Sequence, residues 1–220
     1  MNDSQGTHQG RGGPSRRDFL RGSGVAAATA ALAQAPLPSA LEGAPASEAP
    51  AFGPKPVKLT LDVNGKPTTT SVEPRVTLLD ALRNYIGTVT GCKRVCDRGT
   101  CGACTVMLDG VPVYSCTTLA LEAQGKKIKT ALSLVDGGKL DAVPAAFAHH
   151  DAQQCGFCTP GFVVAMRAVL DKNPKASPAE IERGLAGNIC RCGTYEQMRH
   201  AIADLCGVKG GAAEPERKEE

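Results

Sequence analysis

Eight of the ten cysteines in this 220-residue chain fall into two sets of four, and these sets constrain the possible folds more than any other feature. The first set comprises Cys96, Cys101, Cys104 and Cys116, and the second comprises Cys155, Cys158, Cys190 and Cys192. Four cysteines that meet in space bind a metal centre or form disulfides. Aromatic residues make up only 4% of the chain and Trp is absent, so such crosslinks or cofactors would support a core with few large side chains.

The spacing of the first set is specific. It reads C-x4-C-x2-C, followed by eleven residues and the fourth cysteine, which is the plant-type ferredoxin pattern for one [2Fe-2S] cluster. Three thiolates on one loop would wrap around the cluster, and the fourth would close its other side. Gly99 and Gly102 would let the loop bend and let backbone N–H groups approach sulfur, which tunes the reduction potential. A structural zinc site or a disulfide loop is the alternative.

The sequence around the first set predicts a small α+β domain over residues 57–132. Apolar and polar residues alternate from 57 to 63, as in a half-buried strand, and Asn64-Gly65 is a strong hairpin signal. Pro112 places its strand at an edge or a bulge of the sheet. The expected elements are strands at 57–63, 68–72, 105–108, 111–114 and 127–130, a helix that Thr77 caps, and a loop from 91 to 104.

Residues 133–208 have a different, helical pattern, and we expect a small four-helix bundle there. Two of its helices carry start signals, because Ser177 and Thr194 are each followed three residues later by Glu or Gln, as in a capping box. The expected helices span residues 140–150, 161–170, 178–185 and 195–205.

The second cysteine set lies at two turn–helix junctions of this bundle, and the bundle would place both junctions at one end. Its spacing is C-x2-C and, 31 residues later, C-x-C. Spacing alone leaves three possibilities open: a second iron–sulfur cluster, a zinc site with four cysteine ligands, or a pair of disulfides. A C-x-C pair is an unusual half-site for tetrahedral zinc, whereas disulfides would suit an exported protein.

The N-terminal region predicts export. Arg16-Arg17 precedes Phe19-Leu20 and an Ala-rich run from 25 to 35, as in a twin-arginine signal, a route that exports folded proteins to the periplasm. We expect the signal region to span 1–46, a flexible linker 47–56, and a disordered charged tail 209–220; small residues offer two cleavage sites, near 33 and 46. The sequence has no run of 18 or more apolar residues, so we expect no transmembrane anchor. The charge after residue 46 is nearly balanced, which gives no support for nucleic-acid binding.

Two longer motifs identify a family. Residues 154–161, Gln-Cys-Gly-Phe-Cys-Thr-Pro-Gly, and residues 187–195, Gly-Asn-Ile-Cys-Arg-Cys-Gly-Thr-Tyr, resemble the xanthine oxidase and aldehyde oxidoreductase family of molybdenum hydroxylases. The loop 96–106 is similar to that family's other cluster loop, and the resemblance covers residues 57–208. It implies an α+β chain with a β-grasp ferredoxin-type domain and a four-helix bundle. It also implies that each domain holds one [2Fe-2S] cluster.

The resemblance further implies that this chain is a non-catalytic electron-transfer subunit. Electrons would leave a large molybdopterin-binding subunit, cross the helical-domain cluster and then the ferredoxin-domain cluster, and reach an FAD-binding subunit or a cytochrome. By motif position Gln154 and Cys192 would contact the pterin, although Gln154 could instead cap a helix end. The twin-arginine signal resembles that of periplasmic aldehyde oxidoreductases, so aldehydes are the first expected substrate and N-heterocycles, such as xanthine or isoquinoline, the second.

Two rival functions differ in what they leave unexplained. A free-standing ferredoxin-like carrier accounts for residues 57–132 but gives the helical bundle no task. A zinc- or disulfide-stabilised binding module would be colourless and would give no EPR signal after reduction.

Five residues depart from the motifs or invite another reading. Cys92 stands where relatives often carry Thr, and we expect it to pack under the cluster loop, with ligand swapping as the alternative. Val95 replaces a common Gly and would alter solvent access to the first cluster. Cys206 is expected to be an ordinary buried residue, and the pair His149-His150 a charged helix end and not an iron ligand.

Overall fold

The structure is a computed structural model that describes residues 52–87 and 89–208. The predicted signal region, most of the predicted linker and the predicted C-terminal tail lie outside these residues. The part of the linker that is described, residues 52–56, contains neither helix nor strand. Among the described helices, none combines the length and the apolar character that a membrane span requires.

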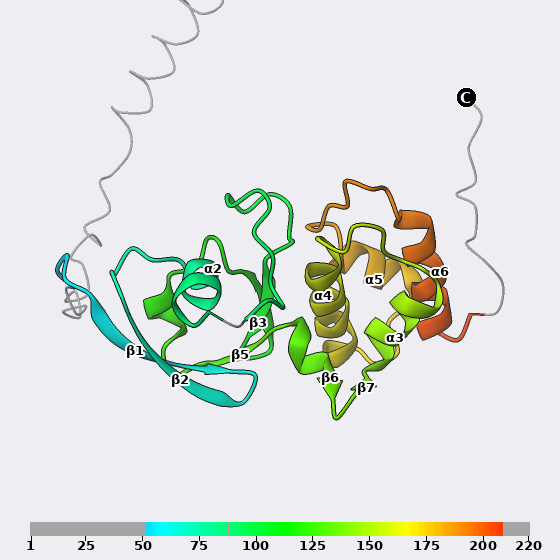
Figure 1. Cartoon of the computed structure of the whole chain (residues 1–220). Helices are drawn as coiled ribbons and strands as arrows, with labels where there is room; N and C mark the ends of the chain where they lie inside the picture. The colour runs from blue at the N-terminus through cyan, green and yellow to red at the C-terminus, as the bar shows by residue number, and fades with distance from the viewer. Residues whose placement is uncertain (1–51, 88, 209–220) are drawn as a thin grey trace, which may run out of the picture. The chain divides into compact units, whose positions relative to one another are not determined.

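A five-stranded mixed sheet forms the first half of the described chain, with the strand order β2-β1-β5-β3-β4 (Figure 1). The second and third strands in this order, β1 and β5, run parallel, and the other neighbours are antiparallel. Pro112 lies in the edge strand, where its missing N–H costs no ladder hydrogen bond, as predicted. The strands are β1 (Val57–Val63), β2 (Lys66–Val72), β3 (Thr105–Leu108), β4 (Val111–Tyr114) and β5 (Lys127–Lys129).

The first hairpin forms as its sequence predicts. Leu59, Leu61 and Val63 alternate into the core, because successive side chains of a strand point to opposite faces. Asn64 and Gly65 both have positive φ, 52° and 78°, which is the backbone of a type I′ turn. The turn sets the register, in which Val63 faces Lys66 and Val57 faces Val72.

The helix that follows is shorter and wider than the prediction. Thr77 caps it as expected, with its hydroxyl accepting from the backbone N–H of Asp80 at 3.2 Å. After α2 (Leu78–Asp80) the chain widens into a π-helical segment, η2 (Ala81–Tyr85), in which Ile86 N–H donates to the Ala81 carbonyl at 2.9 Å. The side chains of Leu78, Leu79 and Leu82 are completely buried, so this segment covers the sheet's core.

The second half of the described chain is helical (Figure 1). Its helices are α3 (Ala142–His149), α4 (Thr159–Lys172), α5 (Pro178–Gly184) and α6 (Tyr195–Leu205). Before them lie two 3-10 turns, η3 (Ala120–Ala123) and η4 (Ala131–Leu134), and a short hairpin of β6 (Val135–Asp136) and β7 (Lys139–Leu140).

Two helix starts differ from the prediction. Leu140 belongs to β7 and not to the first helix of the bundle, because Asp141 caps α3 by accepting from the Val143 N–H at 2.9 Å. The helix α4 begins at Thr159, two residues earlier than predicted, with Pro160 in its first turn. The capping box of Ser177 and Glu180 is present as predicted.

Each half has its own hydrophobic core, and a small third cluster joins β3 to α4. Phe147, Phe162 and Met166 fill the centre of the helical core. Met107 of β3 packs with Val164 and Ala168 of α4 in the joining cluster. The sheet and the helical bundle therefore share packed apolar side chains as well as the loop contacts described below.

Candidate metal centres

The first cysteine set gathers around the loop between η2 and β3. Three of its cysteines come from this loop, and the fourth, Cys116, follows β4 on the neighbouring side. Cys104 and Cys116 are buried, whereas Cys96 and Cys101 are partly exposed. The set therefore has an inner, buried half and an outer half at the rim of the domain.

Sulfur atoms of this set meet in pairs. The Cys96 thiol interacts with that of Cys101, and the Cys104 thiol with that of Cys116. A [2Fe-2S] cluster takes two protein ligands on each of its two irons. Two pairs of thiols are the donor set that such a cluster requires.

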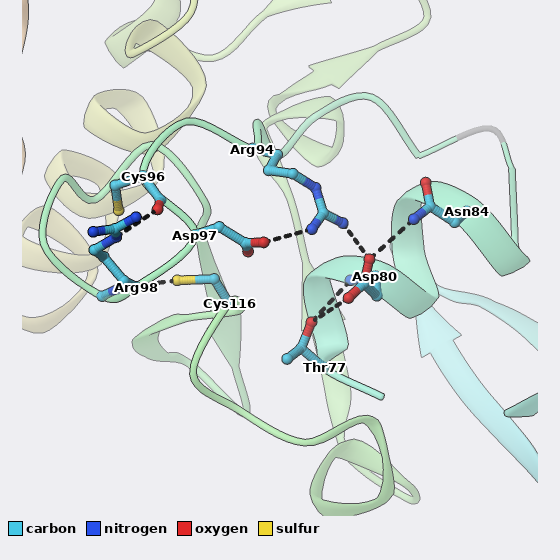
Figure 2. Close-up of polar contacts among 9 residues, drawn as sticks. Thr77, Asp80, Asn84, Arg94, Cys96, Asp97, Arg98 and Cys116 are labelled. Atoms are coloured by element: carbon cyan, nitrogen blue, oxygen red, sulfur yellow. Dashed lines mark hydrogen bonds and ion pairs between the residues drawn. The ribbon is translucent and has the colours of Figure 1, made fainter. Parts of the chain in front are cut away.

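The backbone supports these sulfurs in the way that the glycine positions predicted. The Gly99 N–H donates to the Cys116 Sγ at 3.2 Å, and Gly99 has a φ of 73° that other residues rarely adopt. The buried Ser115 hydroxyl donates to the Cys104 carbonyl at 2.7 Å and fixes the inner part of the loop. Figure 2 shows the outer part, where Arg98 Nε donates to the Cys96 carbonyl at 3.2 Å.

Local environment separates the thiols of this set electrostatically. A hydrogen bond from the Thr100 side chain, aided by backbone N–H groups, lowers the pKa of Cys96 to about 6. Burial raises the pKa of Cys116 to about 11. Metal ligands must be thiolates, so a metal centre at this set would find the Cys96 sulfur more readily ionised than the Cys116 sulfur.

The second cysteine set gathers at the start of α4 and in the loop before α6, as predicted. Cys158 is the N-cap of α4, and Cys190 and Cys192 precede α6. The thiols again interact in two pairs, Cys158 with Cys190 and Cys155 with Cys192. The first of these pairs is buried and the second is exposed.

Thr194, the N-cap of α6 (Tyr195–Leu205), and Tyr195, its first residue, both contact Cys190 of this set. The Thr194 hydroxyl lies 3.3 Å from the Cys190 Sγ and makes no capping hydrogen bond, so the capping box predicted for Thr194 and Gln197 is wrong. The Tyr195 hydroxyl accepts from the Cys190 N–H at 2.7 Å. Burial acts to raise the pKa of Cys190, but hydrogen bonds from Thr194 outweigh it and lower the pKa to about 7. Burial raises the pKa of Cys158 to about 12.

Each set offers the four sulfur donors that a [2Fe-2S] cluster takes. In residues 52–87 and 89–208, no three Cys, His, Asp or Glu side chains are grouped to hold one metal ion. All ten cysteines are free thiols. Four pairs of thiols, two pairs in each set, match two dinuclear clusters with two thiolates on each iron.

Hydrogen bonds connect the two cysteine loops directly. The Ile189 N–H donates to the Cys101 carbonyl at 2.9 Å, and the Asn188 side-chain amide donates to the Gly102 carbonyl at 3.0 Å. The Tyr114 hydroxyl donates to the Gly187 carbonyl at 2.9 Å. Residues 187–189, which directly precede Cys190 of the second set, thus bind the first cysteine loop and the end of β4.

The Gly102 carbonyl is the centre of this junction. Besides Asn188, it accepts from the Thr105 hydroxyl at 2.6 Å and from the Thr105 N–H at 3.1 Å. A Cβ on Gly161 of α4 would lie 2.2 Å from the same oxygen, so only glycine permits this approach. Neither Asn188 nor Tyr114 was singled out from the sequence, although Asn188 stands inside the 187–195 motif.

The structure also places the remaining predicted residues. Gln154 is exposed beside the second set, and α3 does not use it as a cap. Cys92 is completely buried in the core of the sheet domain, where burial raises its pKa to about 11. Cys206 is half-buried at the C-terminal end of α6 and donates to the Ala176 carbonyl at 3.3 Å. His149 ends α3, and His150 follows as its C-cap.

Comparison with known proteins identifies both halves of the described chain. Residues 61–133 match a family model described as a 2Fe-2S iron-sulfur cluster binding domain, and residues 129–203 match one described as a [2Fe-2S] binding domain. These matches decide the nature of both sites in favour of clusters over zinc or disulfides. Residues 13–33 match the twin-arginine translocation pathway signal sequence.

Individual relatives agree with these domains. The chain is 42% identical over 154 residues to the nicotine 6-hydroxylase small subunit of Paenarthrobacter nicotinovorans, covering 70% of this chain and 92% of that subunit. It is 40% identical over 209 residues to the aldehyde oxidoreductase iron-sulfur-binding subunit of Escherichia coli, covering 87% of this chain and 88% of that subunit.

A solved structure adds agreement in three dimensions. Quinoline 2-oxidoreductase from Pseudomonas putida 86 includes a chain that superposes with a TM-score of 0.66 at 42% identity. The superposition covers 70% of this chain and 96% of that one. The chain therefore belongs to the iron–sulfur subunits of the xanthine oxidase and aldehyde oxidoreductase family of molybdenum hydroxylases, and it transfers electrons through two [2Fe-2S] clusters.

Proposed function

We propose that this chain carries electrons from a molybdopterin-binding partner to an FAD-binding subunit in an exported aldehyde-oxidising complex. The observation that carries the proposal is the arrangement of eight thiols in four pairs, two pairs in each half of the described chain. The proposed ligands are Cys96, Cys101, Cys104 and Cys116 for the ferredoxin-type cluster, and Cys155, Cys158, Cys190 and Cys192 for the helical-domain cluster. The proposed domain limits are 57–132 and 133–208.

The surface around the second set supports its assignment to the molybdopterin-binding side. Cys155 and Cys192 are exposed, and the apolar side chains of Phe157 and Ile189 beside them are 55% and 53% exposed. Exposed apolar side chains gathered at one place favour a protein partner. Gln154, exposed in the same loop, offers an amide that can both donate to and accept from a pterin.

Each cluster, when bound, takes up and releases one electron at a time. This chain's own residues supply the rest of the function, namely the ligands, their burial and the hydrogen bonds to sulfur. The Gly99 N–H and the Thr194 hydroxyl are groups of this kind, at 3.2 Å from Cys116 Sγ and 3.3 Å from Cys190 Sγ. Such contacts adjust the reduction potential of a cluster.

The extent of similarity supports aldehydes as the substrate class. The match to the aldehyde oxidoreductase subunit spans 87% of this chain, against 70% for the nicotine 6-hydroxylase subunit. The twin-arginine signal match supports export of the folded chain to the periplasm. Hydroxylation of an N-heterocycle is the second candidate, because the nicotine and quinoline enzymes act on that class and their subunits are each 42% identical to this chain.

Anaerobic purification of the complex from the periplasmic fraction tests the electron-transfer assignment. We expect close to four irons and four acid-labile sulfides per copy of this chain, and two distinct EPR signals after dithionite reduction. Cys104→Ser should remove one signal and Cys155→Ser the other, whereas the control Cys206→Ser should keep both. Two irons, or none, would contradict the assignment.

Substrate and partners are tested on the same preparation. Benzaldehyde added without an electron acceptor should bleach the cluster absorption, and quinoline should not; the reverse result favours the N-heterocycle candidate. Chromatography of the native material separates a complex from a free carrier, because a lone species of 22.7 kDa would indicate a ferredoxin-like shuttle. Flavin or haem absorption in the purified complex identifies the acceptor subunit.

A further inference from the structure

Asp97, the residue after Cys96, has an uncommon backbone conformation, and Arg94 binds its side chain. Asp97 has a φ of 55°, a left-handed conformation that few residues other than glycine adopt. Its carboxylate Oδ2 accepts from Arg94 Nη1 at 2.7 Å (Figure 2). Because Asp97 is bonded directly to Cys96, anchoring the Asp97 side chain also restrains the backbone beside Cys96.

The same arginine is attached to the core of the domain. Arg94 Nη2 pairs with the Asp80 carboxylate at the end of α2. Asp80 is itself held at three further points: its N–H donates to the Thr77 hydroxyl, that hydroxyl donates to Oδ2 at 3.2 Å, and Asn84 Nδ2 donates to Oδ1 at 2.9 Å. The neighbouring Leu79 is completely buried, so this anchor is as fixed as the core.

The arginine also balances the charge beside the outer pair of thiols. Arg94, Asp80 and Asp97 are only partly exposed, with 33%, 33% and 42% of their side chains accessible. An arginine guanidinium stays protonated in proteins, so it brings a permanent positive charge to both carboxylates. Without it, both carboxylates would lose their ion-pair partner, and one of them, Asp97, is bonded directly to Cys96.

We propose that Arg94 is a positioning residue for the ferredoxin-type cluster, which it serves by clamping Asp97, and with it Cys96, to Asp80 on the helix. The clamp fixes the outer ligand loop and its charge balance, so it sets both the geometry and the reduction potential of this cluster. This inference rests on the proposed role of Cys96 as a ligand. Figure 2 shows the chain of contacts from Asn84 through Asp80 and Arg94 to Asp97.

Potentiometric EPR titration of the complete, cluster-loaded complex tests the inference. Arg94→Gln removes the positive charge, so reduction of the ferredoxin-type cluster becomes less favourable and its potential should shift down. Asp97→Asn removes a negative charge, so the same potential should shift up. Arg94→Lys keeps the charge but loses the two-pronged geometry, so its potential should stay close to that of the wild type while its EPR lines broaden.

Two comparisons distinguish a specific shift of the ferredoxin-type cluster from a general loss of structure. The helical-domain cluster in the same samples should keep its potential in all three variants. Arg167→Gln is the matched control, since Arg167 also lies between two carboxylates, those of Asp141 and Asp171, outside both cysteine loops. It should move neither potential.

Opposite shifts of the ferredoxin-type cluster in Arg94→Gln and Asp97→Asn, with the other cluster unchanged, would establish the clamp. No shift in these two variants, shifts of the same sign, or equal shifts of both clusters would overturn it. Failure of the ligand assignment gives a separate result, because Cys96→Ser would then leave the ferredoxin-type EPR signal of the complex unaltered. A variant whose iron content is reduced has not assembled and is left out of the comparison. If Arg94→Gln fails in this way, the width of the EPR lines of Arg94→Lys decides the question.

Discussion

Replacing Gly161 with alanine tests how closely α4 must approach the first cysteine loop. A Cβ at this position would lie 2.2 Å from the Gly102 carbonyl oxygen and 3.0 Å from the Ala103 Cα, both backbone atoms that cannot turn aside. A normal contact requires the helix and the loop to separate by about 1 Å, since carbon and oxygen atoms pack at roughly 3–3.5 Å. That shift lengthens the Asn188 bond to Gly102 and the Ile189 bond to Cys101, now 3.0 and 2.9 Å.

The expected loss follows from three contributions. Alanine in place of a helical glycine gains about 1 kcal/mol, overpacking costs about 1–3 kcal/mol, and the two hydrogen bonds contribute about 1 kcal/mol each. The net destabilisation is therefore about 2–4 kcal/mol. For a chain of this size it corresponds to a decrease in Tm of about 4–16 °C.

Calorimetry of the cluster-loaded chain at a fixed scan rate measures this decrease, and EPR measures the magnetic interaction between the two reduced clusters. Gly184→Ala is the control: its Cβ would meet the Val169 side chain at 2.3 Å, which can rotate away. We expect it to change Tm little and to leave the magnetic interaction intact. The reasoning is refuted if Gly161→Ala unfolds at the same temperature as Gly184→Ala.

Three further predictions concern single side chains. Asn188→Ala removes a buried donor to Gly102 and should destabilise the chain by about 1–3 kcal/mol in denaturant titrations. Cys92→Ala should leave the iron content at four per chain if Cys92 only packs under the loop; two irons would make it a ligand. Ser177→Ala should cost about 0.5–2 kcal/mol by loss of the N-cap. Hydrogen bonds from the Ser177 N–H and hydroxyl lower the pKa of Glu180, so the share of this advantage that comes from the hydroxyl–carboxylate bond should be present at neutral pH and be lost as the pH falls through that lowered pKa. The share from the N-cap bond itself should remain.

Local signals explain the part of the fold that the sequence predicts well. The strand alternation, the Asn64-Gly65 turn and the Ser177 capping box each depend on residues within a few positions of one another. The cysteine spacings predicted where the sulfurs gather for a similar reason, since three cysteines of the first set share one loop and those of the second set lie in two close pairs, each beside a helix start. These elements therefore needed no knowledge of distant contacts.

The features that the sequence did not predict depend on long-range packing. Thr194 looks like a capping residue in its local sequence, but in the fold the Cys190 sulfur lies nearer to its hydroxyl. The π-helical turn after Asp80 adjusts the helix to the buried face of the sheet. The bond between Asn188 and Gly102 joins residues 86 positions apart, and no periodicity encodes such a pairing.

The Gly102 carbonyl accepts three hydrogen bonds, and this has a consequence for the speed of electron transfer. A dipole that is free to turn reorients when charge arrives nearby, and that reorientation adds to the activation barrier. Three donors, two from Thr105 and one from Asn188, hold this dipole in one direction next to Cys101. The carbonyl oxygen therefore reorients little when a cluster in this loop gains or loses an electron. A small reorientation keeps the reorganisation energy at the junction of the two loops low.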